Sequence, residues 1–355
     1  MQNRFFNPHF KAGKNARTFL AITGVLLALA AYKIYSDVFA ENVSLKYATN
    51  GKIYLKVHSG TDIVQLYNEI EHGYYLQNFE SFKRLSKLVN LDKKLKAGRY
   101  LLKPGMSNYE LLKVLVNGRQ EPLNVVFKYA ERVEDLSGFF ANQLETDSTT
   151  LLNLIKDTDV ITKLGFDSNT IISLFIPNTY NFYWNTSSYA LLERMNKEYK
   201  AFWTADRLSK CISLGLTQQQ VSTLASIVQK ESNKGDEMPV IAGVYLNRLR
   251  KEMPLQADPT IIYAWHDNSI RRVTNIHTSI ISPYNTYSNT GLPPGPICAP
   301  SIQAIDAVLN FKEHTFIYFC AKEDFSGYHS FATSFEQHQQ NARRYQRALN
   351  AKNIQ

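Results

Sequence analysis

One glutamate in the C-terminal half of the chain occupies a position from which it could act as an acid–base catalyst. Val221, Leu224 and Val228 recur at helical spacing, and Glu231 follows on the same face. Because an apolar face turns towards the core and loss of solvent disfavours a carboxylate, we expect a raised pKa for Glu231. The alternative interpretation is a solvated glutamate just beyond a helix end, with no catalytic role.

Polar residues in loops rich in proline and glycine could complete a cleft around this glutamate. They gather in segments 253–260, 282–287 and 291–297, where the backbone has little freedom and can preorganise polar groups. Asp258, which precedes a proline, can equally form a turn or cap a helix. His329 can equally be a hydrogen-bonded core or surface histidine.

The sequence lacks the motifs on which several other chemistries depend. We find no H-E-x-x-H zinc motif, Walker loop, G-x-G-x-x-G motif or G-x-S-x-G nucleophile elbow. The three cysteines, Cys211, Cys298 and Cys320, contain no C-x-x-C pair, which argues against a disulfide scaffold and a structural zinc site. We therefore expect no metal and no cofactor, and we interpret the cysteines as small buried apolar residues.

Periodicity and capping signals predict the elements that must position these residues, and together they indicate an α+β fold. Before residue 160 a short strand followed by a helix occurs twice, with a further strand and helix between them. The expected segments there are 53–70, 98–102, 107–116 and 124–144. Beyond residue 160 we expect helices at 191–202, 217–231, 239–250 and 301–310, a buried strand at 315–321 and a last helix from Thr333, capped with Glu336.

An aromatic and amide-rich run at 177–184 has two interpretations. Aromatic rings stack on pyranose faces and amides pair with hydroxyls, which suits sugar binding. The same run is equally typical of an aromatic strand or turn that packs between domains.

The N-terminal segment predicts a membrane anchor. Residues 1–17 contain four basic residues and no acidic residue, and the uncharged run 18–32 follows. This run falls short of the roughly 20 residues that cross a hydrocarbon core, but Lys33 can snorkel and apolar residues continue to position 39. The basic tail predicts a single pass with a cytoplasmic N-terminus. A signal peptide cleaved near residue 40 and a buried core helix are the alternatives.

Composition narrows the choice of partner. The 355 residues are 44% hydrophobic and 20% charged, which excludes a disordered chain, and the net charge of +9 favours an anionic partner. A nucleic acid is excluded, because the chain has no clustered basic motif interleaved with aromatic residues and would lie outside the cytoplasm. A membrane surface or an acidic polymer remains.

Several blocks in the C-terminal half resemble the YceG-like family of endolytic murein transglycosylases. They follow the family order from about residue 216 to 350: Leu224–Ser232, Val244–Leu249, Leu255–Thr260, Tyr284–Tyr287, Gly291–Ile297, Ala299–Pro300 and His329–Phe331. The family's catalytic glutamate corresponds to Glu231. Many members carry a second glutamate two positions earlier, where this chain has Gln229. Glu231 is therefore the only carboxyl group in this motif.

The resemblance implies how the chain is divided and where it works. The expected parts are a cytoplasmic tail (1–17), a transmembrane anchor (18–39), a LysM-like α+β module (45–159) and a mixed α+β catalytic domain (160–355). The expected location is the cell (inner) membrane, with the catalytic domain extracytoplasmic. The implied partners are nascent peptidoglycan strands and the peptidoglycan synthases that polymerise them.

The resemblance also implies a mechanism that needs one carboxyl group. Glu231 would protonate the glycosidic oxygen between N-acetylmuramic acid (MurNAc) and N-acetylglucosamine (GlcNAc), and then deprotonate the muramoyl 6-hydroxyl as it attacks C1. The product would be a 1,6-anhydro-MurNAc end. The residues expected to bind substrate as a group are Asn247, Gln256, Asp258, Tyr284, Asn285, Thr286, Tyr287 and His329.

Two other functions remain compatible with the residues. A hydrolytic muramidase would use Glu231 as acid and Asp258 as the second carboxylate that hydrolytic glycosidases usually require. A non-catalytic peptidoglycan-binding scaffold would use the same surfaces without cleaving the strand.

Overall fold

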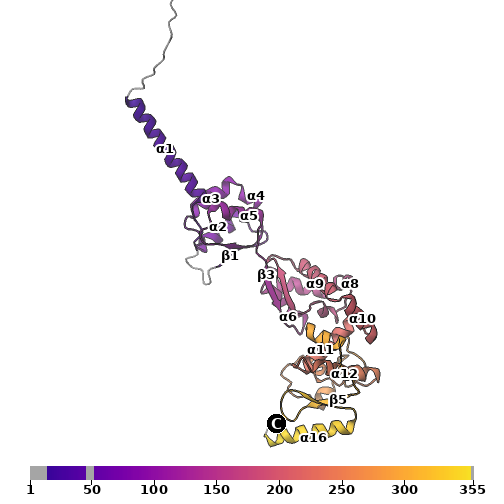
Figure 1. Cartoon of the computed structure of the whole chain (residues 1–355). Helices are drawn as coiled ribbons and strands as arrows, with labels where there is room; N and C mark the ends of the chain where they lie inside the picture. The colour runs from indigo at the N-terminus through magenta and orange to yellow at the C-terminus, as the bar shows by residue number, and fades with distance from the viewer. Residues whose placement is uncertain (1–13, 45–51, 353–355) are drawn as a thin grey trace, which may run out of the picture. The chain divides into compact units, whose positions relative to one another are not determined.

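The computed structural model describes residues 14–44 and 52–352 and divides into two compact units (Figure 1). The first unit is formed by Met1–Leu123 with Tyr183–Asn185, and the second by Asn124–Phe182 with Thr186–Gln355. Residues 124–159, which the resemblance assigned to the module, therefore belong to the second unit. Most of the expected cytoplasmic tail and the expected start of the module at residue 45 lie outside the described residues.

The first unit begins with the long helix α1 (Lys14–Phe39). Within the described residues, one helix is long and apolar enough to cross a membrane: Asn15–Phe39, with a mean hydropathy of 1.7 and none of it buried. Phe19, Leu27 and Ile34 all expose most of their surface. This exposure is incompatible with the buried core helix that was one alternative for the segment.

In the described residues of the first unit, two antiparallel strands and four helices follow α1. Ile53 of β1 pairs with Leu102 of β2, and Val57 pairs with Gly98. The core lies between this sheet and the helices and contains buried Phe82. The elements are β1 (Ile53–Val57), α2 (Ile63–His72), α3 (Phe79–Leu88), α4 (Leu91–Lys94), β2 (Gly98–Leu102) and α5 (Asn108–Asn117). The expected capping box of Ser107 with Glu110 is present.

The N-terminal part of the second unit surrounds a two-stranded sheet of β3 and β4. Its elements are β3 (Leu123–Phe127), α6 (Val133–Ala141), α7 (Ser148–Lys156), α8 (Thr158–Lys163), the 3₁₀ helix η1 (Ile171–Leu174), β4 (Asn178–Phe182), α9 (Ser188–Phe202) and α10 (Ala205–Leu214). The aromatic run at 177–184 supplies β4, and its Tyr180, Phe182 and Trp184 are buried. These three rings therefore pack inside the protein, which favours the packing interpretation over sugar stacking.

The C-terminal part of the second unit is built around helix α11. Helices α10, α12, α13 and α15 all contact α11, while β5 and β6 pair with Phe319 opposite Phe331 and lie against α16. The elements are α11 (Gln218–Glu231), α12 (Met238–Arg250), α13 (Asp258–Trp265), α14 (Asn275–Thr278), α15 (Ile302–Leu309), β5 (Tyr318–Ala321), β6 (His329–Ala332) and α16 (Phe335–Ala351).

Two local predictions in this part were wrong in detail. The last helix is capped by Ser334, whose hydroxyl accepts from the Gln337 backbone N–H, so Thr333 and Glu336 do not form the expected box. The buried strand begins at Tyr318 instead of residue 315 and is only partly buried. The mixed α+β class itself is confirmed, with three sheets of two strands each among the described residues.

Candidate active site

Glu231 is the last residue of α11, and the helix places it at the edge of the core. The expected capping box of Thr217 with Gln220 starts the helix, and Val221, Leu224 and Val228 are buried along its inner face. Glu231 continues that face and is half-buried. The structure therefore places this carboxyl group on the helix face that periodicity indicated, at the boundary between core and solvent.

The Glu231 carboxyl group lies in a cleft of about 270 Å³. Side chains from α11, α12, α13, α16, β5 and the loop before α13 line it together with Tyr287. The lining residues are Glu231, Tyr245, Arg248, Leu255, Gln256, Asp258, Tyr287, Tyr318, Phe319, Phe335 and His338. The cleft thus combines carboxyl, amide and guanidinium groups with aromatic rings, which are the groups that grip a sugar chain.

The surroundings raise the pKa of Glu231 to about 7, and burial of the carboxylate is the main cause. The Tyr245 hydroxyl opposes this rise by donating a 2.6 Å hydrogen bond to Glu231 Oε1. The charge of Asp258 raises the pKa further, and the positive charge of Arg248 lowers it. A carboxyl group with this pKa exchanges its proton readily near neutral pH.

Asp258 brings a second carboxyl group into the same cleft. It is the first residue of α13, and the Tyr287 hydroxyl donates a hydrogen bond to Asp258 Oδ1. Burial raises the pKa of Asp258, while this hydrogen bond counteracts the rise. The Asp258 carboxyl group is therefore partly buried and hydrogen-bonded within the cleft, and it does more than cap a helix.

Arg248 is a buried guanidinium group that holds the loop on which Gln256 lies. Nη1 donates to the backbone oxygens of Pro254 at 3.0 Å and Leu255 at 2.8 Å, and to Gln256 Oε1 at 3.2 Å. Nε donates to the Ile317 backbone oxygen at 2.6 Å. Gln256 has a φ of 52°, in the left-handed region that non-glycine residues rarely adopt. Such strained residues persist only where their surroundings fix them, and they cluster at functional sites.

Four of the predicted site residues hold loops or elements together and do not line the cleft. Asn247 Nδ2 donates to the backbone oxygens of residues 314 and 316, and Asn285 Nδ2 to those of residues 278 and 280. The Thr286 hydroxyl accepts from the Ala257 backbone N–H at 2.9 Å. His329 pairs through Nδ1 with Glu237 Oε2 at 2.8 Å.

Tyr284 is likewise absent from the residues that line the cleft. Its ring packs on Tyr263 with a centroid separation of 4.9 Å, and Tyr263 in turn lies under the Arg132 guanidinium group. Of the predicted residues, the structure therefore brings Glu231, Gln256, Asp258 and Tyr287 together in one cleft.

Sequence reasoning missed seven other residues that line the cleft: Tyr245, Arg248, Leu255, Tyr318, Phe319, Phe335 and His338. A signal existed for two of them, because residues three apart on a helix share a face, and Tyr245 and Arg248 are so spaced. Asn247, chosen from the same block, lies on another face of α12. His338 comes from the last helix, and its Nδ1 is buried without a hydrogen-bond partner among the described residues.

Gln229, where many relatives are expected to carry a second glutamate, does not line the cleft. Its Oε1 accepts from the Ser301 backbone N–H at 2.7 Å, and its Nε2 lies 3.7 Å from Cys298 Sγ. An amide can satisfy both an N–H donor and a sulfur acceptor there, so this side chain fixes the segment before α15. Cys298 and Cys211 are buried, as expected, and Cys320 is partly buried.

Comparison with known proteins identifies the family. The model of the YceG-like family matches residues 55–344, and the chain belongs to this family. It is 29% identical over 78% of its length to an endolytic murein transglycosylase of Streptococcus pneumoniae strain D39, of which it spans 55%, about half. It is 28% identical over 76% of its length to an endolytic murein transglycosylase of Bacillus subtilis, of which it spans 74%.

A solved structure shows the same fold. The chain matches the crystal structure of a YceG-like protein from Listeria monocytogenes with a TM-score of 0.55 and 24% identity, over 82% of this chain and 99% of that one. At this level of identity the likeness is one of fold alone.

Proposed function

We propose that this protein is an endolytic murein transglycosylase and that Glu231 is its catalytic residue. The observation that carries the proposal is the half-buried carboxyl group of Glu231, whose pKa is raised to about 7 within a polar and aromatic cleft. Family membership and the names of the relatives from Streptococcus pneumoniae and Bacillus subtilis support the same activity.

In the proposed reaction one carboxyl group serves twice. Protonated Glu231 gives its proton to the GlcNAc oxygen as the bond from MurNAc C1 to that oxygen breaks. Ionised Glu231 then takes the proton of the muramoyl 6-hydroxyl while that oxygen bonds to C1. The proton is returned, no water is consumed, and the product is a 1,6-anhydro-MurNAc end. A pKa near neutrality suits both steps.

The predicted cleft residues divide into two proposed roles. We assign Gln256, Asp258 and Tyr287 to direct contact with the glycan, because they line the cleft with Glu231. The remaining predicted residues hold the loops and strands around the cleft and are positioning residues: Asn247, Tyr284, Asn285, Thr286 and His329.

A hydrolytic muramidase is the second candidate function, and the presence of Asp258 in the cleft supports it. Hydrolytic glycosidases use two carboxyl groups, and Asp258 is close enough to influence the pKa of Glu231. The names of the relatives favour the lytic reaction. Mass spectrometry of digested glycan strands separates the two functions, because hydrolysis leaves reducing MurNAc ends and the lytic reaction leaves anhydro ends.

The first prediction is that Glu231→Gln abolishes cleavage while it preserves the fold and glycan binding. The amide keeps the size of the side chain but cannot give or take the proton, so we expect a loss of at least about a hundredfold in rate. Release of anhydro fragments from purified strands measures the rate, and co-sedimentation with insoluble peptidoglycan measures binding. Glu313→Gln, at an exposed position, is the matched control. Retained cleavage by Glu231→Gln would show that another residue is the acid.

We further propose that α1 anchors the protein in the cell membrane with the N-terminus in the cytoplasm. Its length and exposed apolar surface support an anchor. The part of the first unit beyond α1 belongs to the proposed LysM-like module, and nascent peptidoglycan strands and their synthases are the proposed partners. Confinement to the membrane would place the enzyme where new strands emerge.

A further inference from the structure

Helix α1 enters the first unit without a flexible linker. Ala40 alone separates the end of the helix at Phe39 from Glu41, which forms a β-bridge with Ser107. Two residues later, Val43 forms a second bridge with Leu76. The direction of the helix is thus tied to the unit within four residues of its last turn.

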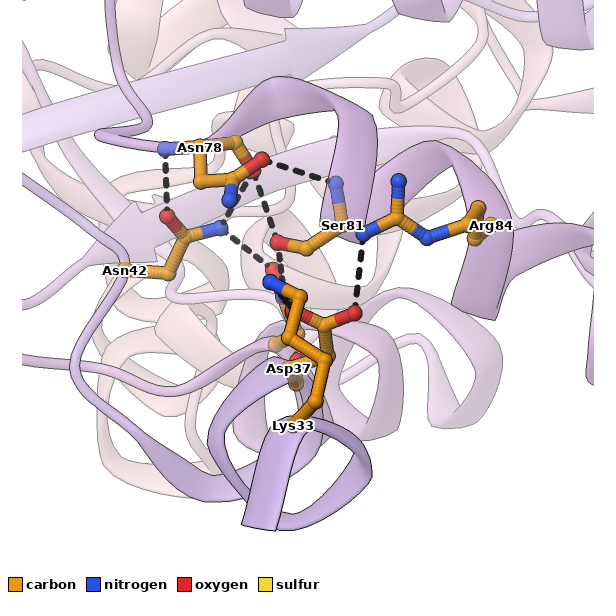
Figure 2. Close-up of polar contacts among 7 residues, drawn as sticks. Lys33, Asp37, Asn42, Asn78, Ser81 and Arg84 are labelled. Carbon is orange, nitrogen blue, oxygen red and sulfur yellow. Dashed lines mark hydrogen bonds and ion pairs between the residues drawn. The ribbon is translucent and has the colours of Figure 1, made fainter. Parts of the chain in front are cut away.

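A polar junction fastens the last turn of α1 to α3 and α5 (Figure 2). The Asp37 carboxylate accepts from Lys33 Nζ and from Arg84 Nη2, each at 2.8 Å. The Asn108 amide nitrogen donates to the Asp37 backbone oxygen at 2.8 Å. Asp37 therefore connects its own helix with a side chain from each of the other two.

Further polar groups extend this junction into the unit, as Figure 2 shows for the buried Asn42 and Ser81 and the exposed Asn78. Asn42 Nδ2 donates to Asn108 Oδ1 at 2.7 Å, and its Oδ1 accepts from the Asn78 backbone N–H, also at 2.7 Å. Asn42 and Asn108 are 4% and 1% exposed. A buried network of hydrogen-bonded groups favours one arrangement, so the junction is rigid and not a hinge.

The length of α1 places this junction at the boundary of the membrane. The uncharged run begins at Thr18 after Arg17, and roughly 20 helical residues cross the hydrocarbon core, so the core ends near residue 37. Asp37, Lys33 and Arg84 then lie at the outer boundary, where mutual ion pairing lowers the cost of charge next to lipid.

An aromatic and basic patch lies at the same level and is formed by Tyr35, Phe39, Tyr109 and Lys113. The Phe39 ring is 5.4 Å from Tyr35 and 5.7 Å from Tyr109, and Lys113 Nζ lies 5.6 Å above Tyr109. The three aromatic side chains are exposed by 62%, 52% and 49%, and Lys113 is exposed. Aromatic rings beside basic groups are typical of the membrane–water interface, where the rings enter the headgroup layer and the cations meet anionic phosphates.

We propose that the first unit rests on the anionic phospholipid surface through this patch and that the Asp37 junction holds it there. The inference depends on the proposed membrane anchor and goes beyond it. An anchor alone would allow the unit to swing about its attachment, whereas the patch and junction fix the face that meets the lipid.

Depth-dependent fluorescence quenching tests the proposal on the full chain in phosphatidylglycerol-containing vesicles. Tyr109→Trp adds a tryptophan within the patch, and the spectrum of the parent chain is subtracted. Lipids brominated high in the acyl chain should quench the added fluorescence by about twofold, as expected for a ring at the interface. Val64→Trp, at an exposed position on α2, is the matched control and should be quenched much less. Equal quenching at both positions, or at neither, overturns the proposal.

Two further measurements distinguish the possible failures. Resistance of the same chain to alkaline extraction from the vesicles tests whether α1 spans the membrane. A chain that is extracted refutes the membrane anchor. A chain that stays embedded but shows no quenching refutes contact between the patch and the lipid. Asp37→Ala, added to Tyr109→Trp, removes both ion pairs and should reduce the quenching at least by half. Glu80→Ala, which removes the 4.0 Å contact with Lys83 on the same α3, should not. Unchanged quenching with Asp37→Ala would refute the holding role of the junction.

Discussion

Near neutral pH, the protonated and ionised forms of Glu231 are present in similar amounts. Burial drives its pKa upwards and the Asp258 charge adds to this, while the Tyr245 hydrogen bond and the Arg248 charge hold it at about 7. A glutamate in water would be ionised and could not serve as acid, whereas an unopposed buried one would hold its proton too tightly to donate it efficiently. The neighbours therefore keep the same group competent for both proposed steps.

Tyr245→Phe should move the alkaline limb of the pH–rate profile to higher pH. The hydroxyl stabilises ionised Glu231, so its removal raises the pKa further and the group stays protonated over a wider range. Because the acid step requires the proton, activity should persist at alkaline pH, while proton donation by the less acidic carboxyl group should be slower throughout. The profile of kcat/KM, which reports the free enzyme, is the measurement.

Tyr318→Phe is the matched control for this change. Tyr318 lines the same cleft, and its hydroxyl makes no hydrogen bond to Glu231 in the described structure. The alkaline limb should therefore keep its position. A downward shift in Tyr245→Phe, or the same upward shift in both variants, would contradict the role given to the Tyr245 hydrogen bond.

At the scale of single residues, the sequence predicted the candidate catalytic glutamate but few of the residues that line the cleft with it. Periodicity located Glu231, because a helical face depends only on residues nearby in the chain. Tyr318 and His338 reach the cleft from elements about a hundred residues later, and no local pattern encodes that approach. Asn285 and Thr286 were placed in the right loop, but whether such a side chain meets a ligand or a backbone group is decided by tertiary contacts.

At the scale of elements, Arg248 couples α12 to the loop that carries Gln256 and Asp258. Its guanidinium group hydrogen-bonds three backbone oxygens and the Gln256 side chain, and it is only 7% exposed. The loop passes through the left-handed conformation of Gln256, so it needs this external support. The planar, five-donor geometry of arginine suits the task, and lysine cannot reproduce it.

Arg248→Ala should destabilise the protein by about 2–4 kcal/mol, because it leaves buried carbonyl groups without a donor. Arg248→Lys retains the charge but loses most of the hydrogen bonds, so we expect an intermediate loss of stability and a marked loss of cleavage. Urea unfolding and release of glycan fragments measure the two effects. Arg250→Ala, at an exposed position on the same helix, should change stability by less than about 1 kcal/mol. Equal losses at 248 and 250 would refute the special role of the buried guanidinium group.

Most elements could be predicted because their boundaries depend on local chemistry. The capping boxes at Thr217 and Ser107 begin helices where expected. The last helix was misplaced because two adjacent residues, Thr333 and Ser334, can both cap, and backbone geometry selects the second. Strand β5 was predicted too long, since an apolar run shows that residues can be buried but not where their partner strand ends.

At the scale of the whole molecule, the boundary between the units could not be predicted from local patterns. The repeated strand–helix pattern suggested one module up to residue 159, but β3 pairs with β4, about fifty residues later. Residues 124–159 consequently belong to the second unit, and the chain returns to the first at Tyr183–Asn185. Both features depend on long-range pairing, which one sequence does not reveal.

This return gives Trp184 a structural role in the first unit. Its ring lies 4.8 Å from the His58 ring and under Lys56 Nζ at 5.3 Å, and the next residue, Asn185, donates to the Ala97 backbone oxygen at 3.2 Å. Trp184 is 4% exposed, so its side chain completes the packing beside β1 and β2.

Trp184→Ala should therefore destabilise the first unit by about 3 kcal/mol, the usual cost of removing a buried tryptophan. Because the lost contacts are with residues next to β1 and β2, amide hydrogen exchange should accelerate in these strands, while amides of α11 and α12 keep their protection. Exchange measured by mass spectrometry on the full chain resolves the two regions. Tyr183→Ala, at the neighbouring 54% exposed position, is the control and should accelerate exchange in β1 and β2 much less. Exchange that accelerated first in α11 would instead show that the tryptophan stabilises the second unit. The sugar-stacking interpretation of the aromatic run would regain support only if Trp184→Ala also weakened glycan binding.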